Sequence, residues 1–159
     1  MKLYLEFDHI VDDPMCNIVV NDQQLYSGAV QPIYDFELDV VDGDISLCIE
    51  HWDKRPEDTV VENGKIVCDR SFELKQIKVD NYDLEELIWQ SEFRAADGAV
   101  YKSCLFFGPN GCFVLNFTKP VLGWILKTRH TLNNNDPTWE QDYHYYIQAC
   151  KILTQISIK

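Results

Sequence analysis

Short runs in which apolar and polar residues alternate constrain the fold of this chain more than any other feature. The segments 2–7, 34–40 and 45–49 all alternate in this way, with residues such as Leu3 and Leu5 falling on one side. A period of two places the apolar side chains on one face of a β-strand. The sequence therefore predicts half-buried strands, and an apolar share of 46% supplies enough residues for a core.

Turn-forming residues separate the alternating runs. Asn21-Asp22, Asp42-Gly43, Asn63-Gly64 and Asn110-Gly111 each stand between two apolar segments. Such pairs favour the tight turns of β-hairpins, so we predict a hairpin at each of them. The apolar phase slips near Lys75-Gln76, which indicates a β-bulge within the strand over residues 71–79.

Helical signals appear towards the C-terminus. Thr118-Lys119-Pro120 resembles a helix start, and Asp136-Pro137 opens a segment with aromatic residues at spacings of three and four. Residues 84–90 fit either a strand or one helical turn. We expect three tryptophans to lie in the core: Trp89, Trp124 and Trp139.

Together these patterns predict a mainly β fold. Roughly eight short strands followed by one or two C-terminal helices are typical of an antiparallel, jelly-roll-like β-sandwich with a helical appendage. A chain of 159 residues suits one domain. We expect a single domain over residues 1–159, with the sandwich over 1–117 and helices packed on it over 118–159.

Charge and cysteine content narrow the functional classes. A net charge of −12 repels phosphate backbones, so we expect no direct nucleic-acid binding. No apolar run is long enough to span a membrane, and the first residues lack the pattern of a signal peptide. Six scattered cysteines, without a CxxC pair, are expected to be reduced and intracellular, with a disulfide framework as the alternative.

Local catalytic motifs are absent from the sequence. It contains no nucleophile elbow, P-loop, HExxH or glycine-rich dinucleotide turn, and its four histidines are isolated. We therefore expect a protein that is not an enzyme. A cysteine paired with a distant histidine is the alternative that a sequence without motifs leaves open.

An acidic strand face is a first candidate site. Asp35, Glu37 and Asp39 alternate with apolar residues, so they should share one face of a strand. The simplest interpretation is a solvated face that discourages edge pairing. The alternatives are a negative patch for a basic partner or a calcium site, which makes calcium the one cofactor left open.

The loop that follows residue 51 is the second candidate. A tryptophan among charged residues and a proline offers a flat apolar face beside hydrogen-bonding groups, a combination that binds sugars and proteins. The alternative is that this tryptophan closes the end of the sandwich. The predicted ligand-binding residues are Trp52, Asp53, Asp58, Asn63 and Asp69.

Segments 54–70 and 77–80 resemble a small family of uncharacterised proteins from tailed, T4-like bacteriophages of marine bacteria. Residues 117–120 together with Trp124 are similar to the later part of the same proteins. The resemblance covers about half of the chain and implies an origin more than an activity. The expected location is a virion or the cytoplasm of an infected host.

A shorter likeness concerns residues 69–72 and 77–80. They are similar to a strand pattern of calcium-dependent xylan-binding modules, which are β-sandwiches. This likeness implies the same fold class for our chain.

The expected function is a non-enzymatic, phage-type binding protein, a virion component that recognises a protein or a glycan. One alternative is an acidic early phage protein that binds and inhibits a basic, nucleic-acid-binding host protein. The other is an enzyme whose site is assembled from distant residues. The sequence gives neither the oligomeric state nor the order of the strands.

Overall fold

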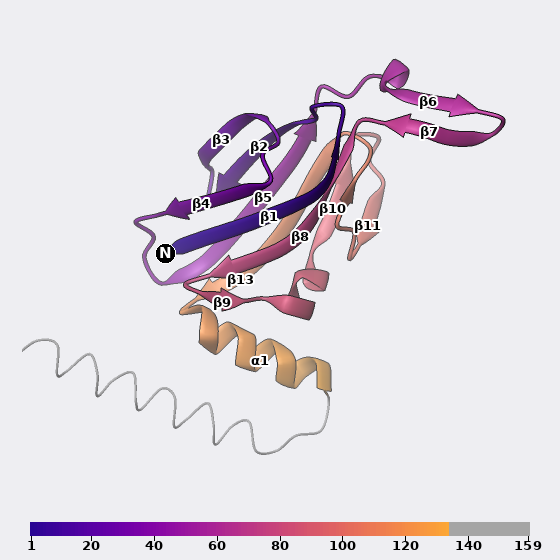
Figure 1. The fold of residues 1–159 in the computed structure, drawn as a ribbon. Coiled ribbons are helices and arrows are strands. Elements are labelled where there is room, and N and C mark those ends of the chain that lie inside the picture. The colour runs from indigo at the N-terminus through magenta and orange to yellow at the C-terminus, as the bar shows by residue number, and fades with distance from the viewer. Residues whose placement is uncertain (134–159) are drawn as a thin grey trace, which may run out of the picture.

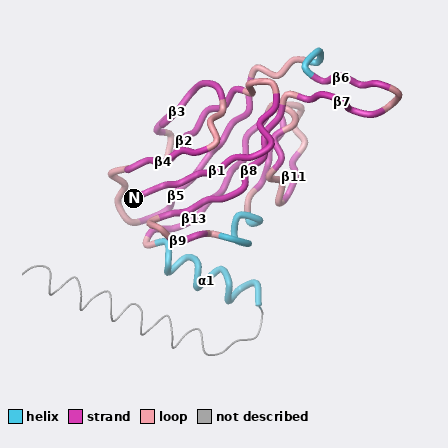
Figure 2. Tube along the Cα trace, in the orientation of Figure 1, coloured by secondary structure: helices cyan, strands magenta, loops and turns pink. Residues whose placement is uncertain are grey.

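The computed structural model describes residues 1–133, which form two antiparallel sheets packed face to face (Figures 1 and 2). Sheet A has the order β12-β8-β1-β4, and β9 pairs with the C-terminal end of β8. Sheet B has the order β11-β10-β13-β5-β2-β3. The predicted mainly β, antiparallel sandwich with a helix near the C-terminus is confirmed.

The strands of sheet A are β1 (Lys2–Val11), β4 (Ile33–Glu37), β8 (Ser71–Val79), β9 (Tyr82–Asp83) and β12 (Phe106–Phe107). Those of sheet B are β2 (Met15–Val20), β3 (Gln23–Ala29), β5 (Gly43–Trp52), β10 (Glu92–Ala95), β11 (Val100–Lys102) and β13 (Gly111–Lys119). A separate ribbon pairs β6 (Thr59–Glu62) with β7 (Lys65–Asp69). The helices are the 3₁₀ turns η1 (Pro56–Asp58) and η2 (Glu85–Gln90) and the α-helix α1 (Val121–Asn133).

The core lies between the two sheets and follows the alternation of the sequence. Leu3 and Leu5 of β1 are fully buried, as are Leu47 and Ile49 of β5. Phe72 of β8 stands at the centre of an aromatic cluster that includes residues of both sheets. Every second residue of these strands therefore faces the core, as a half-buried strand requires.

Two predicted hairpins are confirmed. Asn21 and Asp22 connect β2 to β3, and both have positive φ angles, as a type I′ turn requires. Asn63 and Gly64 connect β6 to β7 in the same way. The predicted bulge is confirmed at Lys75, where the register between β1 and β8 slips by one residue.

The other two predicted hairpins are wrong. Asp42-Gly43 leads from β4, which pairs with β1, to β5, which pairs with β2 and β13. Asn110-Gly111 leads from β12, which pairs with β8, to β13. In both places the chain crosses from sheet A to sheet B, because successive strands of a sandwich often belong to opposite sheets.

The predicted helical elements are confirmed in part. Residues 85–90 form η2, and α1 begins directly after Pro120. Trp89 is 49% exposed, so its prediction as a core residue is wrong. The segment from Asp136, with Trp139, lies outside the described residues, and the division of the chain at residue 117 stays a prediction.

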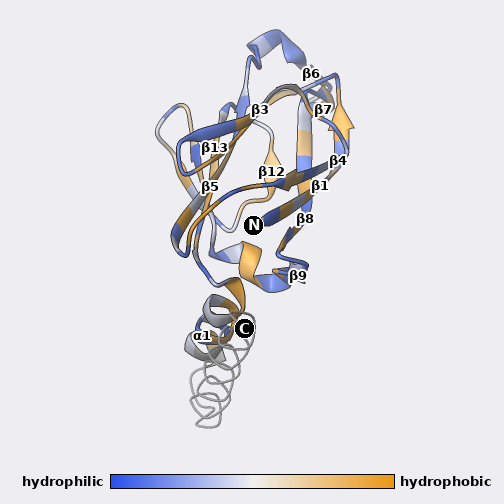
Figure 3. Ribbon diagram, turned by 90° about the vertical axis from the view of Figure 1, so that its left-hand side faces the viewer, coloured by the Kyte–Doolittle hydropathy of each residue, from blue (hydrophilic) through white to orange (hydrophobic). Residues whose placement is uncertain are grey.

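Two features mark the ends of the sandwich. The β6–β7 ribbon, which we call the arm (residues 59–69), extends beyond one end (Figure 1). Helix α1 lies at the opposite end, as the rotated view also shows (Figure 3). No helix within residues 1–133 has the length and apolar character that crossing a membrane demands.

Candidate functional site

The base of the arm contains four of the five residues predicted to bind a ligand. Trp52 is the last residue of β5, Asp53 follows it, and Asp58 and Asp69 flank the arm strands. Asn63 lies at the arm tip, at the far end of the ribbon from the other four.

Trp52 is packed at the end of sheet B. It pairs with Met15 across β2, and its side chain is half-buried. Its indole Nε1 is buried and has no hydrogen-bond partner within residues 1–133. A ring held in this way presents less of its face to a ligand than an exposed loop tryptophan would, which agrees with the alternative that it closes the end of the sandwich.

The Asp58 carboxylate is tied to groups of the protein. Its Oδ2 lies 3.2 Å from Arg70 Nη1 and accepts a hydrogen bond of 2.8 Å from the backbone N–H of Arg55. Arg70 also donates from Nε to the Asp12 carbonyl at 3.0 Å and from Nη1 to the Asp53 carbonyl at 3.3 Å. Arg70 therefore joins the β1–β2 loop, the end of β5 and the turn η1 that precedes the arm.

The Asp69 carboxylate is held from two sides. Its Oδ1 lies 2.5 Å from Lys54 Nζ and accepts a second hydrogen bond of 2.5 Å from Thr59 Oγ1. Partial burial opposes ionisation of Asp69, but the hydrogen bonds from Lys54 and Thr59 outweigh it, so the pKa of Asp69 lies below its ordinary value. Lys54 Nζ also donates to the Gly108 carbonyl at 2.8 Å.

The loop between β12 and β13 supports Lys54. Asn110 accepts a hydrogen bond from the Lys54 backbone N–H at 2.9 Å and donates one to the Lys54 carbonyl at 2.8 Å. Beside it, His51 Nδ1 lies 3.1 Å from the Pro109 carbonyl. A carbonyl only accepts, so the proton of the neutral ring belongs on Nδ1. Burial of His51 lowers its pKa, which favours this neutral form.

Above this polar base the arm exposes apolar side chains. Val60, Val61, Ile66 and Val67 are all between 43% and 65% exposed. The register pairs Val61 with Ile66 and Val60 with Cys68, so apolar groups occur on both faces of the ribbon. Such a cluster on a projecting ribbon is uncommon for a surface that contacts only water.

A groove of about 450 Å³ runs between the arm and the β12–β13 loop. Its apolar lining includes Pro56, Ile66, Phe106 and Pro109, and its polar lining includes Lys54 and Asp69. We call this feature the arm groove. Its size falls within the range of ligand sites.

The acidic strand face lies elsewhere. Asp35 and Glu37 are exposed on β4, at an edge of sheet A, and Asp39 is exposed just after it. Lys2 pairs with Glu37 in the register. The position at a sheet edge agrees with the interpretation that these charges discourage edge pairing.

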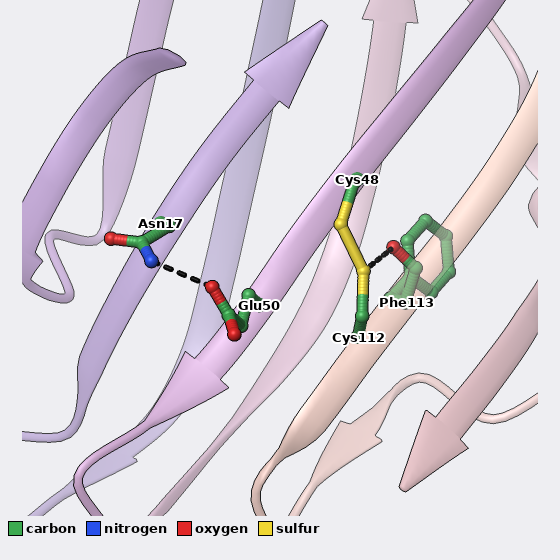
Figure 4. Close-up of a disulfide and its surroundings, with 5 residues drawn as sticks. All are labelled: Asn17, Cys48, Glu50, Cys112 and Phe113. Atoms are coloured by element: carbon green, nitrogen blue, oxygen red, sulfur yellow. Dashed lines mark hydrogen bonds between the residues drawn. A yellow bond between two sulfur atoms is a disulfide. The ribbon is translucent and has the colours of Figure 1, made fainter. Parts of the chain in front are cut away.

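The cysteines are not all reduced, contrary to the prediction. Cys48 and Cys112 form a disulfide between β5 and β13 (Figure 4). Their Cα atoms lie 6.2 Å apart, because the register places them diagonally on the same outward face of two adjacent strands. The two cysteines are 64 residues apart in the sequence, so their proximity follows only from the order of the strands.

Two of the free cysteines, Cys16 and Cys68, lack the environment of a nucleophile. Burial raises the pKa of Cys16 to about 11. A hydrogen bond from its thiol to Asp12 Oδ2, 2.9 Å away, raises the pKa of Cys68. Activation requires a lowered thiol pKa, so both environments act in the opposite direction.

A resident metal also finds little support in the described chain. Among the side chains that the structure describes, no three of His, Cys, Asp or Glu come together in a way that could hold an ion. Asp58 and Asp69 already have cationic partners, which would compete with calcium for their oxygens.

Several residues of this region escaped prediction from the sequence. Lys54 and Arg70 were not singled out, because their partners are distant in the chain. Ile66 and Phe106 were assigned to ordinary strands. The signal that could have found the arm is its two apolar doublets, Val60-Val61 and Ile66-Val67, which break the alternation expected of a half-buried ribbon.

No family model matches the chain, and no curated protein matches it. A solved structure described as "vCBM60 in complex with galactobiose" is similar to 72% of this chain and 96% of its own, with a TM-score of 0.45 and 11% identity. The resemblance to proteins of tailed bacteriophages therefore stays a prediction.

Proposed function

We propose that this chain is a non-enzymatic binding protein that recognises another protein with its arm and the adjoining arm groove. The observation that carries the proposal is the exposure of four large aliphatic side chains on a ribbon that leaves the sandwich. When a partner covers one of these half-exposed valine or isoleucine side chains, apolar surface is removed from water. Each side chain then contributes roughly 1 kcal/mol to the free energy of binding.

The construction of the arm supports this role. β6 and β7 pair only with each other within the described chain, so both outer edges of the ribbon have free backbone groups. A partner can pair with such an edge while its side chains contact Val61 and Ile66. The ion pairs of Lys54 with Asp69 and of Arg70 with Asp58 fix the base of the arm, which lowers the entropy lost on binding.

The expected partner offers an apolar surface or an extended apolar segment. Aliphatic side chains on both faces of the arm favour a protein over a glycan, whose hydroxyl groups need hydrogen-bonding partners. The side chains expected to contact a glycan here are also less available, because Trp52 is half-buried and both Asp58 and Asp69 have partners within the chain.

The role as a virion component stays a proposal, as does the alternative of an acidic protein that occupies a basic host protein. The two differ in the type of surface that is used. The arm would bind through apolar contacts that persist at high salt, whereas a basic partner held by the acidic surface would dissociate.

A photo-crosslinking experiment tests the proposal. A crosslinking amino acid replaces Ile66 in one sample and Val41 in the other. Val41 is 83% exposed and lies just before β5, at the opposite end of that strand from the arm. Both samples are incubated with purified particles and with host extract at low and at high salt.

A defined protein that crosslinks from position 66 at both salt concentrations, is absent from the Val41 sample and loses affinity for the Val61→Ser/Ile66→Ser variant supports the proposal. Both substitutions are at exposed positions, so the variant should remain folded. Partners that ignore this double substitution, or that bind only at low salt, would contradict it.

A further inference from the structure

The outward face of sheet B carries a second candidate site, far from the arm. Along β5 and β13 the buried residues Ile45, Leu47, Leu115 and Phe117 point inward. Their neighbours therefore point outward. The register pairs these neighbours as Ser46 with Asn116 and Asp44 with Thr118.

A hollow of about 470 Å³ opens over these two pairs. We call it the Trp124 hollow and define it by Asn21, Asp44, Ser46, Asn116, Thr118 and Trp124. Trp124 reaches it from α1 and packs against Phe117, with ring centroids 5.9 Å apart. Trp124 is only partly buried and is one of the residues that line the hollow.

Asn21 fixes the rim of the hollow. Its Oδ1 accepts a hydrogen bond of 2.8 Å from the Ser46 backbone N–H, and its Nδ2 donates to the Asp44 carbonyl at 3.4 Å. These bonds use the backbone of β5 and leave the two side chains of that strand available.

The remaining polar side chains have no partners in the described chain. The hydroxyls of Ser46 and Thr118, the amide of Asn116 and the carboxylate of Asp44 form no hydrogen bond with any other group that the structure describes. Together they provide two hydroxyls that donate and accept, an amide that does both and a carboxylate that only accepts.

The outward face of sheet A has a different composition. There Lys75 Nζ lies 2.7 Å from Glu6, and Lys78 Nζ lies 5.1 Å from the centre of the Tyr4 ring. That face is covered by charged groups that contact one another, which is typical of a solvated sheet. The Trp124 hollow instead combines mostly uncharged polar groups with an aromatic ring.

We propose that the Trp124 hollow binds a neutral saccharide. A sugar ring has an apolar C–H face that can pack on the indole and a rim of hydroxyls that can donate to Asp44 and exchange hydrogen bonds with Ser46, Asn116 and Thr118. The volume suits one or two sugar rings. The lining contains no Lys or Arg, and the Asp44 carboxylate repels anions, so acidic sugars are disfavoured.

This site is independent of the proposed arm function. The hollow is lined by Trp124 of α1, and α1 lies at the end of the sandwich opposite the arm (Figure 3). A saccharide bound here would leave the arm free for its partner, and the two activities can be lost separately.

Binding is measured on the full chain by NMR and calorimetry with lactose, cellobiose, maltose and chitobiose, each to millimolar concentration. Sialyllactose serves as the acidic match for lactose. We expect at least one neutral disaccharide to bind, to shift the Asn116 side-chain amide and the Trp124 indole signals, and to bind more tightly than its acidic match. Failure of all four neutral sugars, or tighter binding of sialyllactose than lactose, would overturn the proposal.

Variants locate the site. Trp124→Ala should weaken binding by tenfold or more, but it also removes the contact with Phe117. Asn116→Ala and Thr118→Val change exposed side chains, keep the fold and should each weaken binding about three- to tenfold. Trp89→Ala, at an exposed tryptophan outside the hollow, and the arm variant Val61→Ser/Ile66→Ser should bind as the wild type does. Binding that survives both Asn116→Ala and Thr118→Val unchanged would contradict the assignment.

Discussion

Lys54 and Asp69 form the contact that joins the arm to the sandwich, with Nζ 2.5 Å from Oδ1. Lys54 leaves the end of β5, Asp69 ends β7, and the same ammonium group donates to the Gly108 carbonyl between β12 and β13. One cation thus links three segments that are distant in the sequence. We expect the orientation of the exposed aliphatic residues to depend on this link.

Replacing Lys54 by methionine should loosen the arm. Asp69 would keep only the hydrogen bond from Thr59, and leaving a partly buried carboxylate underpaired costs about 1–2 kcal/mol. We expect amide protection in β6 and β7 to fall about tenfold, as measured by hydrogen exchange, with sheet B unchanged. Lys75→Met, which removes an exposed ion pair with Glu6, is the control and should leave arm protection unaltered. Equal effects of the two substitutions would contradict the role of Lys54.

Acid should loosen the arm through Asp69. The pKa of this carboxyl is lower in the folded protein than in the unfolded chain, so its contribution is fully present above the unfolded pKa of about 4. The contribution is lost as the pH falls through the lowered pKa. Hydrogen exchange of β6 and β7, referred to sheet B, should show protection that is constant above about pH 5 and decreases below about pH 4. Asp69→Asn should have weaker protection at neutral pH and no such decrease, and an Asn variant that follows the wild-type profile would argue against this group.

His51 should make the whole fold sensitive to mild acid. Burial lowers its pKa below the unfolded value of about 6.5, so below that pH the unfolded chain binds a proton that the folded protein resists. The free energy of unfolding should therefore decrease from pH 7 to pH 5, by at most about 1.4 kcal/mol per pH unit for one proton. Urea denaturation at several pH values measures this slope. His51→Gln should flatten it, whereas His9→Gln, at an exposed position, should retain it. A slope that persists in His51→Gln would assign the effect to other groups.

The core should depend strongly on Phe72. Its ring stacks on Phe107 at 4.4 Å and meets Phe7 edge-on at 5.4 Å, and it is fully buried. Phe72→Ala should cost about 3–5 kcal/mol in urea denaturation because it leaves a cavity between the sheets. Phe106→Ala, one residue before Phe107 but 47% exposed, should cost less than about 1 kcal/mol. It should weaken arm-groove binding instead, and a large loss of stability from Phe106→Ala would show that this ring belongs to the core.

Part of the candidate site could be read from the sequence. The loop after β5 and the Asn63-Gly64 hairpin were both predicted, and Asp58 and Asp69 were selected as polar residues of that region. Their partners Lys54 and Arg70 were not predicted, because only the fold brings them close to Asp69 and Asp58. The ligand role of the five selected residues stays a prediction.

The two wrong hairpins have one physical cause. A turn residue such as Gly43 or Gly111 shows that the chain changes direction, but not that the strands on either side pair. In a sandwich the same turn can carry the chain across the core to the other sheet. The disulfide between Cys48 and Cys112 was missed for the same reason, since it depends on β13 lying beside β5.

The sequence by itself determined the character of most segments, because the period of alternation and the conformational preferences of turn residues act over a few neighbouring residues. It predicted most of the longer strands, the two tight hairpins and a bulge near Lys75-Gln76, but it missed β9 and β10 and took residues 101–107 as one strand, which the structure divides into β11 of sheet B and β12 of sheet A. Only the tertiary structure decided which strands pair, which apolar residues remain outside the core and which charges meet. Those outcomes depend on contacts between distant residues, such as Lys54 with Asp69 at the base of the arm and Asn21 with Asp44 and Ser46 at the rim of the Trp124 hollow.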